Sequence, residues 1–516
     1  MKKISLFLVL VLTVFCVPAF FVGCSKSEER NFYKISATFD DKNMSLKCSQ
    51  HLEYVNSSNN TLSQVDFFLY ANTFDEGQKS VPTSYTEKAY PHGESFGRIT
   101  FDEVKVDGQA VEGNVSEGKN ILSVPLLNGL FPQECVTIEM EYEVSLANIR
   151  HRLGFNDNTI NFGNFFPIAC VYEESVGFVN NQFAVNGDPF YSDVSNFEVE
   201  ITYPAKYTLA CSGEMSVAEK SLNYDEKNED DMNGGGEEVR VEENEANPQS
   251  EMKVATCKAS NVRDFCFVLS DKFEVISKMA GDVQVNYYFY DDENAESHLD
   301  TSAKAVETFE KLFGKYPYQE LSVVKAGFCF GGMEYPNLVL IADDLDSSET
   351  EDYVIVHEIA HQWWYGIVGN NEFESAWVDE GLTEFSTALF YEENESYGLK
   401  YDIIMQNATE SYQTFVKAYS KIYGKVDESM NRNLLQFATE PEYVNCTYTK
   451  GMLLFDALRS TMSERKFFGC LKDYFKEFSL KNSSAEKLIE CFCKSSKINL
   501  EGFFKSWIDG TVRVGI

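Results

Sequence analysis

The chain has 516 residues, 44% hydrophobic and 14% aromatic, which is enough apolar material for two or three packed domains. Its 81 acidic and 44 basic residues give a formal net charge of −37, and no basic stripe interrupts this excess. Such a charge disfavours binding to nucleic acid and to anionic lipid surfaces by electrostatic repulsion, and it is typical of a well-solvated exported protein. We therefore expect no nucleic-acid partner.

Residues 1–24 have the pattern of an export signal. Two lysines precede an apolar run from Ile4 to about Gly23, and the sequence then turns polar. Gly23 directly before Cys24 resembles a bacterial lipoprotein cleavage box, although Phe21 stands where such boxes usually carry Leu. We expect a lipid anchor on Cys24, which would hold the protein on the outer face of the bacterial cytoplasmic membrane. Ordinary cleavage with secretion and a retained membrane helix are the alternatives.

Residues 25–276 favour a β-rich N-terminal domain. Short alternating runs such as FYKISATF, VTIEMEYEVSL and NFEVEITYP are separated by Gly, Asn and Asp, which is typical of strands and turns. Within this region, residues 225–251 contain eleven acidic and two basic residues and almost nothing apolar. We expect this segment to be a disordered insertion between strands, because it cannot bury enough surface to offset its ordering entropy.

Longer, helical periods begin after Tyr287. The pattern predicts helices over 298–313, 352–365 and 376–391, followed by further helices as far as Ser506. We divide this half into a mixed α/β region, 277–395, and a helical region, 396–516. The fold class is therefore a multidomain α+β protein.

A candidate metal site lies in the second of these helices. His357-Glu358-x-x-His361 places two histidines four residues apart on one helix face, so both rings can reach one metal ion. Two of only six histidines in the chain occur here, so a chance match is improbable. Trp363 and Trp364 follow, and at helical spacing beside apolar residues they fit a core better than a substrate platform.

A third ligand is available further along the chain. Glu380 follows His361 after eighteen intervening residues, at the start of the next predicted helix. Three protein ligands with an open position are typical of catalytic zinc, whereas a structural site needs four. Glu384, one turn beyond Glu380, is a candidate to accept the second N–H of a ligand histidine, with a plain exposed glutamate as the alternative. The pattern predicts one zinc ion per chain on His357, His361 and Glu380.

Glu358 is the candidate general base. Zinc lowers the pKa of its water toward neutrality, and a neighbouring carboxylate can take the proton as that water attacks a carbonyl. Glu358 is offset by about 100° from His357 on the helix and so points beside the metal.

Together these residues resemble the aminopeptidase N family of zinc metallopeptidases, a gluzincin group. The matching motifs are GGMEY at 331–335, HEIAH, the Glu380 spacing within WVDEG, and YTKG from Tyr448, with looser likeness at 53–74 and in GDPFYSDV from Gly187. The resemblance implies a saddle-like β-rich N-terminal domain and a thermolysin-like catalytic domain. Many members continue into a large C-terminal helical domain; we expect none here, and hence a more open cleft.

The resemblance also implies roles for single residues. In the family the GxMEN glutamate binds the free α-ammonium group of the substrate, which assigns this role to Glu334, flanked by Gly331, Gly332 and Met333. Tyr335 replaces the usual Asn.

A tyrosine hydroxyl of the family stabilises the oxyanion. Tyr448 matches it best, with Tyr443 as a second candidate. A donor aimed at developing negative charge contributes several kcal/mol to catalysis.

The sequence thus predicts a zinc-dependent aminopeptidase whose partners are peptides with a free N-terminus. The nearest alternative is a thermolysin-like zinc endopeptidase, which shares the HExxH core and lacks the amine anchor. A second is a non-catalytic surface binding protein on the same scaffold, and a weaker one an epoxide-hydrolase side activity. The preferred first residue, the oligomeric state and the disulfide pairing are not predictable from the sequence.

Overall fold

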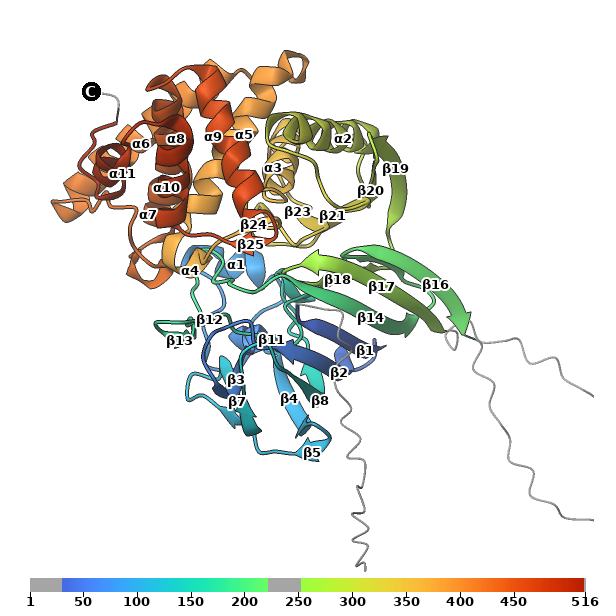
Figure 1. Ribbon diagram of the computed structural model, residues 1–516. Helices are drawn as coiled ribbons and strands as arrows, with labels where there is room; N and C mark the ends of the chain where they lie inside the picture. Colours follow the sequence, from blue (N-terminus) through green and yellow to red (C-terminus); the bar gives the residue numbers. More distant parts are fainter. Residues whose placement is uncertain (1–29, 221–251, 515–516) are drawn as a thin grey trace, which may run out of the picture.

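A β-rich half and a mainly helical half pack against each other in the computed structural model, which describes residues 30–220 and 252–514 (Figure 1). The predicted signal with Cys24 and the acidic segment 225–251 lie outside these residues. Within the described ranges, no helix is both long enough and apolar enough to span a bilayer.

The β-rich half is built on an eight-stranded sheet. Burial alternates along β1 and β8, as the period-2 pattern predicted, so that one face of the sheet packs on the core. The acidic segment joins two paired strands, β16 and β17. Across the sheet the order is β16 (Glu214–Lys220), β17 (Met252–Val262), β14 (Ser195–Pro204), β1 (Phe32–Asp40), β2 (Ser45–Val55), β8 (Cys135–Ser145), β4 (Arg98–Val106) and β5 (Gln109–Ala110).

Two four-stranded sheets complete this half. They pack on the large sheet through one continuous aromatic-rich core, in which Phe162 stacks on Phe267 at 4.2 Å. The first sheet contains β15 (Thr208–Cys211), β18 (Cys266–Ser270), β10 (Ile160–Gly163) and β9 (Leu153–Phe155). The second contains β11 (Ile168–Ala169), β3 (Leu62–Phe68), β7 (Ile121–Leu130) and β6 (Asn114–Val115). Smaller elements are η1 (Tyr70–Phe74), η2 (Thr83–Tyr85), α1 (Thr86–Ala89), β12 (Tyr172–Glu173) and β13 (Gly177–Phe178).

A five-stranded sheet opens the second half of the chain. Its order is β19 (Glu274–Ala280), β20 (Val283–Phe289), β21 (Glu320–Ala326), β23 (Leu338–Ala342) and β22 (Gly332–Met333). The helices α2 (Ala295–Leu312) and α3 (Ser348–Ala360) pack on it (Figure 1). The predicted boundary at residue 276 cuts through β19, which pairs with β20, so the break between the halves lies a few residues earlier.

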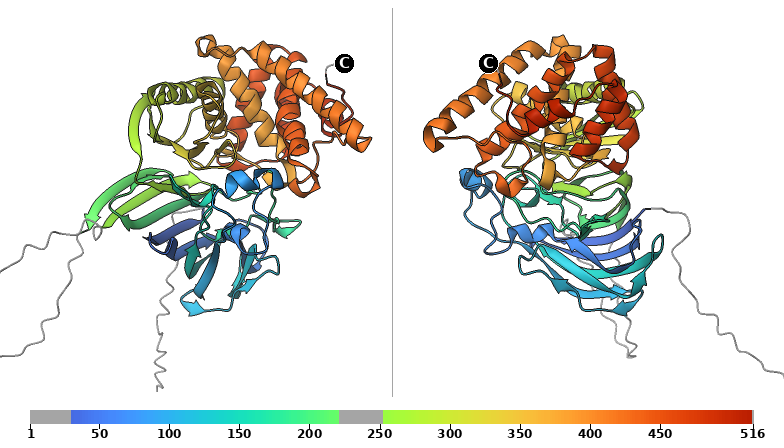
Figure 2. Two further views of the ribbon diagram at one scale, coloured as in Figure 1. Left: turned by 180° about the vertical axis from the view of Figure 1, so that it is seen from behind. Right: turned by 60° about the vertical axis from the view of Figure 1, so that its left-hand side comes forward.

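The remaining helices form a layer beside this sheet, above the β-rich half (Figures 1 and 2). They are α4 (Glu372–Ser375), α5 (Trp377–Glu393), α6 (Tyr401–Tyr423), α7 (Glu440–Val444), α8 (Lys450–Ser460), α9 (Glu464–Phe478), α10 (Ala485–Ser496) and α11 (Glu501–Ile508). Two short strands, β24 (Val368–Gly369) and β25 (Lys481–Asn482), pair in parallel. They connect the segment before α4 with the segment between α9 and α10. The helical C-terminal part of the predicted fold class is thus confirmed.

Helix α3 ends at Ala360, five residues before the predicted end at Tyr365. The chain turns back at Gly366, where an added Cβ would lie 2.9 Å from the carbonyl oxygen of Gln362, so this turn requires glycine. Trp363 and Trp364 enter the core at 0% and 1% exposure, which confirms their predicted structural role.

Candidate active site

Three side chains converge in the interior, from α3, from His361 directly after it and from α5. His361 Nε2 lies 3.2 Å from His357 Nε2 and 3.1 Å from Glu380 Oε2, and His357 Nε2 lies 3.5 Å from the same carboxylate oxygen. Tetrahedral zinc with bonds of about 2.0–2.1 Å holds its ligand atoms roughly 3.3 Å apart. The residues therefore fit a zinc ion with three protein ligands.

The histidine tautomers suit metal binding. His361 Nδ1 lies 3.0 Å from the carbonyl oxygen of Trp364, so this nitrogen donates and leaves the Nε2 lone pair free. His357 Nδ1 lies 3.6 Å from Glu384 Oε1, while Glu384 Oε2 accepts a 2.5 Å bond from the Tyr353 hydroxyl. Glu384 thus lies behind His357, at a distance slightly longer than a hydrogen bond.

The edge strand β22 passes directly beside Glu358. A Cβ at Gly332 would lie 2.4 Å from Glu358 Oε1, so only glycine allows this approach. Glu358 is 5% exposed, and its Oε2 has no hydrogen-bond partner among the described residues. Burial and the neighbouring Glu334 raise the pKa of Glu358 well above its usual range. Active-site carboxyls that act as general bases are commonly shifted in this direction by burial and neighbouring negative charge.

Glu334 follows β22 and is 4% exposed. Its Oε1 lacks a hydrogen-bond partner within the described ranges, and burial raises the pKa of its carboxyl to about 8. An unsatisfied buried carboxyl of this kind calls for a cationic partner. The side chain of Met333 is part of the core, at 0% exposure. At Gly331 an added Cβ would make only ordinary contacts, at 3.7 Å or more.

Tyr448 closes the other side of the cluster. It lies on a π-helical turn, η6 (Asn445–Thr449), and its hydroxyl donates a short hydrogen bond to Glu380 Oε1. Its ring stacks on His357 at 5.9 Å. Gly381 and Gly451 allow this arrangement, because a Cβ at Gly381 would meet Gly451 Cα at 2.9 Å where α5 crosses α8.

Tyr443, the second tyrosine candidate, lies beside Tyr448 with ring centroids 5.6 Å apart. Its hydroxyl is buried at the junction with the β-rich half, where a Cβ at Gly187 would lie 2.4 Å from it. Both candidates are therefore near the cluster, and Tyr448 alone bonds to one of the three ligands.

The β-rich half adds charged groups that the sequence did not reveal. Asp188 forms an ion pair with Arg152, and its charge helps to raise the pKa of both Glu334 and Glu358. From α4, Glu372 is 2% exposed with both carboxylate oxygens unpartnered in the described structure. The only signal was the GDPFYSDV likeness around Asp188. The site as a whole carries more negative than positive charge and so favours cations.

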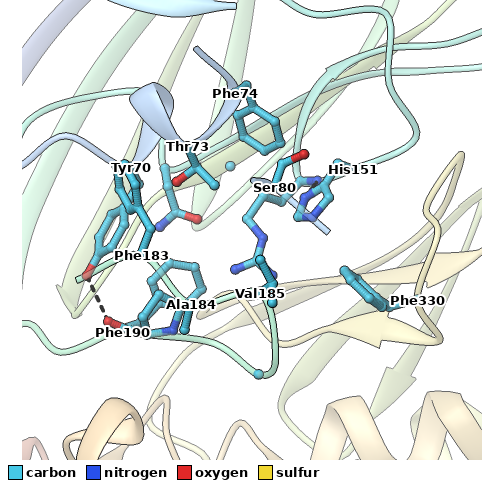
Figure 3. A pocket seen from close by; sticks show the side chains of 15 residues that line it. Tyr70, Thr73, Phe74, Ser80, His151, Phe183, Ala184, Val185, Phe190 and Phe330 are labelled. Atoms are coloured by element: carbon cyan, nitrogen blue, oxygen red, sulfur yellow. Dashed lines mark hydrogen bonds between the residues drawn. The ribbon is translucent and has the colours of Figure 1, made fainter. Parts of the chain in front are cut away.

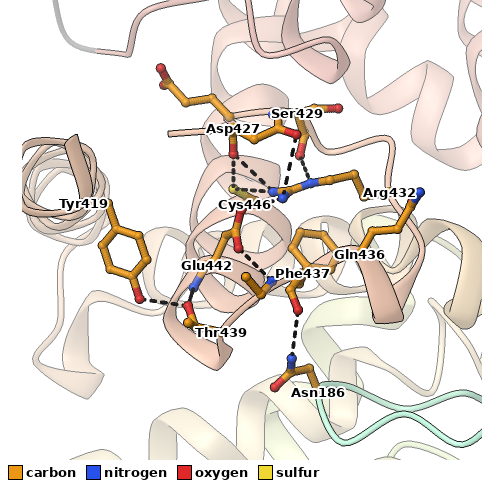
Figure 4. A network of polar contacts seen from close by, with 12 residues as sticks. Asn186, Tyr419, Asp427, Ser429, Arg432, Gln436, Phe437, Thr439, Glu442 and Cys446 are labelled. Atoms are coloured by element: carbon orange, nitrogen blue, oxygen red, sulfur yellow. Dashed lines mark hydrogen bonds and ion pairs between the residues drawn. The ribbon is translucent and has the colours of Figure 1, made fainter. Parts of the chain in front are cut away.

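A loop between α6 and α7 joins this site to the β-rich half (Figure 4). Arg432 anchors the loop through a 2.5 Å ion pair with Glu442 and lies 4.2 Å above the Phe437 ring. Asn186 then donates to the carbonyl oxygen of Phe437 across the junction at 3.5 Å. These contacts hold the segment before Asp188 against the helices that carry Tyr448.

Residues 297–507 match the peptidase family M1 domain. The chain carries an M1 peptidase domain. This confirms the resemblance to the aminopeptidase N family of zinc metallopeptidases. The matched residues contain Glu334, the HExxH helix, Glu380 and Tyr448.

Curated relatives match over the same part of the chain. Leucine aminopeptidase 2 of Yarrowia lipolytica is 28% identical over 210 residues, covering 38% of this chain and 31% of that protein. Aminopeptidase B of Rattus norvegicus is 29% identical over 227 residues, covering 39% and 33%. The match spans about a third of the length of these relatives.

The M1 fold extends over nearly the whole chain. The crystal structure of an M1 zinc metallopeptidase from Deinococcus radiodurans superposes with a TM-score of 0.63 at 16% identity, covering 94% of this chain and 96% of that one. A variant of the same protein bound to a Tyr-Ser-Ala substrate gives a TM-score of 0.61, also at 16% identity, with 94% and 95% covered. At this identity the likeness bears on the fold, and it confirms the predicted β-rich half followed by a helical part.

Proposed function

We propose that the protein is a zinc-dependent aminopeptidase that removes N-terminal residues from peptides, with one zinc ion held by His357, His361 and Glu380. The observation that carries this proposal is Glu334: a buried carboxyl, with Oε1 unpartnered in the described structure, in the same interior as a cluster of three candidate zinc ligands. The family match supports the same reaction.

Glu334 would bind the substrate's α-ammonium group. A carboxylate and an ammonium ion form a charge-assisted hydrogen bond, and a fixed Glu334 then sets the scissile bond one residue away. Because Glu334 is buried, a substrate lacking this positive charge would leave its carboxyl desolvated without compensation. This requirement is what distinguishes an exopeptidase from an endopeptidase.

Glu358 and Tyr448 would carry the proton and charge movements. Zinc in this site would supply Lewis acidity toward the scissile carbonyl and the attacking water. Glu358 accepts the proton of that water and returns it to the leaving amine. The Tyr448 hydroxyl, released from Glu380, donates to the oxyanion of the tetrahedral intermediate.

Glu334→Ala tests the proposal. Loss of one charge-assisted bond of about 1.5–3 kcal/mol predicts a fall of roughly 10- to 100-fold in kcat/KM on a free peptide. The matched control is Glu296→Ala on the outer face of α2, where the side chain is exposed, and it should leave the rate unchanged. Full activity of Glu334→Ala, with cuts inside the peptide, would point instead to a zinc endopeptidase.

Glu358→Gln and Tyr448→Phe test the two assigned catalytic residues. Each variant should retain zinc, because neither residue is one of the three proposed ligands. Each should lose turnover, because Glu358 would move the proton and Tyr448 would stabilise the oxyanion. Wild-type turnover by either zinc-loaded variant would remove that residue from the mechanism.

We also propose that the mature protein begins at Cys24 and carries a diacylglyceryl group there, on the outer face of the cytoplasmic membrane. The support is the apolar run, the small residue before the cysteine and the polar switch after it. Mass spectrometry of the mature N-terminus tests this, and an unmodified or uncleaved terminus would contradict it.

A further inference from the structure

Tyr448 lies on a piece of backbone that is not a regular α-helix. The turn η6 (Asn445–Thr449) is π-helical and stands between the α-helices α7 and α8. Such turns are rare in proteins and occur frequently at functional sites. Because a π-helical turn is less favourable than an α-helical one, the side chains that bind η6 decide whether it keeps its shape, and hence where the Tyr448 hydroxyl lies.

Arg432 binds the start of this turn to the loop between α6 and α7 (Figure 4). Its Nη2 donates to Cys446 Sγ at 3.4 Å and to the carbonyl oxygen of Asp427 at 3.2 Å. Its Nε donates to the carbonyl oxygen of Ser429 at 2.9 Å. Cys446 is fully buried and precedes Tyr448 by two residues. One guanidinium group therefore links η6 to two carbonyl groups of the loop.

Lys450 binds the other end of the turn to the same loop. It is fully buried and follows Tyr448 by two residues. Its ammonium group donates to the carbonyl oxygen of Glu428 and lies 5.9 Å from the ring centroid of Tyr412. Three successive carbonyl groups of the loop thus accept hydrogen bonds from two cations that flank Tyr448. Burying cations is costly unless they are hydrogen-bonded, and these two are.

The loop is itself fixed to the C-terminal end of the described chain. The backbone N–H of Met430 donates to the carbonyl oxygen of Ile508, the last residue of α11, at 2.8 Å. A Cβ at Gly510 would lie 2.6 Å from the carbonyl carbon of Glu428, so the two segments are in close contact. The two cations therefore bind η6 to a part of the loop that other helices already hold.

The β-rich half supports the same region from another side. A largely aromatic pocket lies between this half and the loop before β22 (Figure 3). Gly187 is part of its wall, and a Cβ there would lie 2.4 Å from the hydroxyl of Tyr443 and 2.9 Å from Leu434 Cδ2. The pocket wall thus packs on the tyrosine beside Tyr448 and on the loop between α6 and α7.

The position of the turn matters because the Tyr448 hydroxyl would have two partners in succession. It donates to Glu380 in this structure, and in the proposed reaction it donates to the oxyanion. The Tyr448 ring packs on His357 at 5.9 Å and on Tyr443 at 5.6 Å, so the backbone of η6 sets how far the hydroxyl can reach. A displacement of about 1 Å can cost on the order of 100-fold in rate.

We infer that Arg432 and Lys450 are positioning residues for the reaction: they hold η6 so that the Tyr448 hydroxyl can reach the oxyanion. The inference rests on the proposed function, because it requires that Tyr448 stabilises the oxyanion. It goes further by giving a role in turnover to two buried cations that are not themselves candidates to bind zinc or substrate.

A double-mutant cycle with Tyr448→Phe tests the inference on the zinc-loaded protein with one free peptide. Arg432→Ala should lower kcat by at least about 10-fold, with one zinc per chain and with KM within about twofold of the wild-type value. In the Tyr448→Phe protein the same substitution should change kcat by less than about twofold, because the hydroxyl to be positioned is already absent. Lys450→Met should follow the same pattern.

Arg459→Ala is the matched control. Arg459 pairs with Glu392 at 2.8 Å and lies 5.4 Å from the Tyr401 ring centroid, so it also combines a carboxylate with an aromatic ring. It lies on α8, eleven residues after Tyr448 and so roughly 16 Å along the helix, and its loss should leave kcat unchanged. An equal loss of kcat from Arg432→Ala with and without the Tyr448 hydroxyl would overturn the inference, as would loss of zinc.

Arg432→Lys is a milder variant. It keeps the charge but loses the planar fork that reaches several acceptors at once, so its kcat should lie between those of the wild type and Arg432→Ala. If Arg432→Ala does not fold, Arg432→Lys and Lys450→Met decide the question. Wild-type kcat in both would overturn the inference.

The inference and the proposed function fail differently. Wild-type kcat in Tyr448→Phe would remove Tyr448 from the mechanism, and the inference with it. A large loss of kcat in Tyr448→Phe together with unchanged kcat in Arg432→Ala would overturn the inference alone and leave the proposed mechanism intact.

Discussion

Among the residues that the structure describes, two clusters of histidine and carboxylate side chains occur in the same half of the molecule, and only one of them is suited to a metal. The first consists of His357, His361 and Glu380, hereafter the zinc cluster. In the described part of the chain, the only ion-pair partners of Glu380 are the two histidines. All three ligand atoms face one another, and no side-chain cation lies between them.

The second, the lysine cluster, consists of Asp292, His298 and Glu351. Lys325 Nζ lies 3.1 Å from Glu351 Oε1 and 3.9 Å from Asp292 Oδ2, so the protein supplies its own cation. His298 has no free lone pair to offer, because its Nδ1 contacts Asp292 at 2.9 Å and its Nε2 contacts the Ser348 hydroxyl at 2.9 Å. Similar residue types are therefore suited to bind a metal ion or to form structural links, depending on whether a side chain already occupies the position of the cation.

The sharpest test of this contrast is a pair of histidine substitutions. His361→Gln should lose its zinc and at least about 1000-fold in turnover, because the Lewis acid contributes several kcal/mol. His298→Gln should keep one zinc per chain. Metal content by mass spectrometry and peptide turnover measure both, and zinc loss in His298→Gln would contradict the distinction.

Lys325→Met tests the structural role of the second cluster. Removing one partner of a buried ion pair costs about 3–5 kcal/mol in the free energy of unfolding. Lys315→Met is the control, since Lys315 and its partner Asp282 are 69% and 84% exposed and such pairs contribute less than about 1 kcal/mol. Urea unfolding measures the free energy of unfolding of both variants. Equal losses of this free energy would show that the Lys325 charge is not required to stabilise the lysine cluster.

Zinc should stabilise the fold through the zinc cluster alone. At a zinc concentration 100 times the Kd, the expected gain is about 2.7 kcal/mol. Lys325→Met should show this gain and His361→Gln should not. Thermal unfolding with zinc and with a chelator provides the measurement, and a zinc-dependent shift in His361→Gln would place the ion elsewhere.

Glu384→Gln should have the smallest effect. Losing the carboxylate behind His357 Nδ1 weakens zinc affinity by about 10- to 100-fold, as for other residues that orient metal ligands. Glu393→Gln, on the same helix but paired with the exposed Lys311, is the control. Chelator competition measures both affinities. Unchanged affinity in Glu384→Gln would leave this residue as a partly exposed carboxylate with no role in zinc binding.

The sequence predicted those parts of the site that depend on local spacing. His357 and His361 lie one helical turn apart, so helical geometry brings their side chains toward one metal, and the packing of α5 on α3 adds Glu380. The same reasoning placed the end of α3 five residues too late, at Tyr365, because the turn after Ala360 depends on contacts of Gly366 with the preceding backbone.

The sequence could not predict what distant segments contribute. Asp188 and Arg152 reach the site through the packing of two halves, and no periodicity encodes that contact. The lysine cluster was also missed, since Asp292, Lys325 and Glu351 are spread over three elements and have no recognisable spacing. The alternation in β1 and β8 gave the strands correctly, whereas the order of the sheets depends on pairing between segments far apart in the chain.

One measurement tests the central claim most directly. Zinc-loaded protein beginning at residue 25 is incubated with one peptide in free and N-acetylated forms, and the products are followed by mass spectrometry. Stepwise loss of residues from the N-terminus of the free peptide alone is the predicted result. Internal cleavage of both forms would contradict the account and indicate an endopeptidase, and no cleavage of either would indicate a binding protein built on the M1 fold.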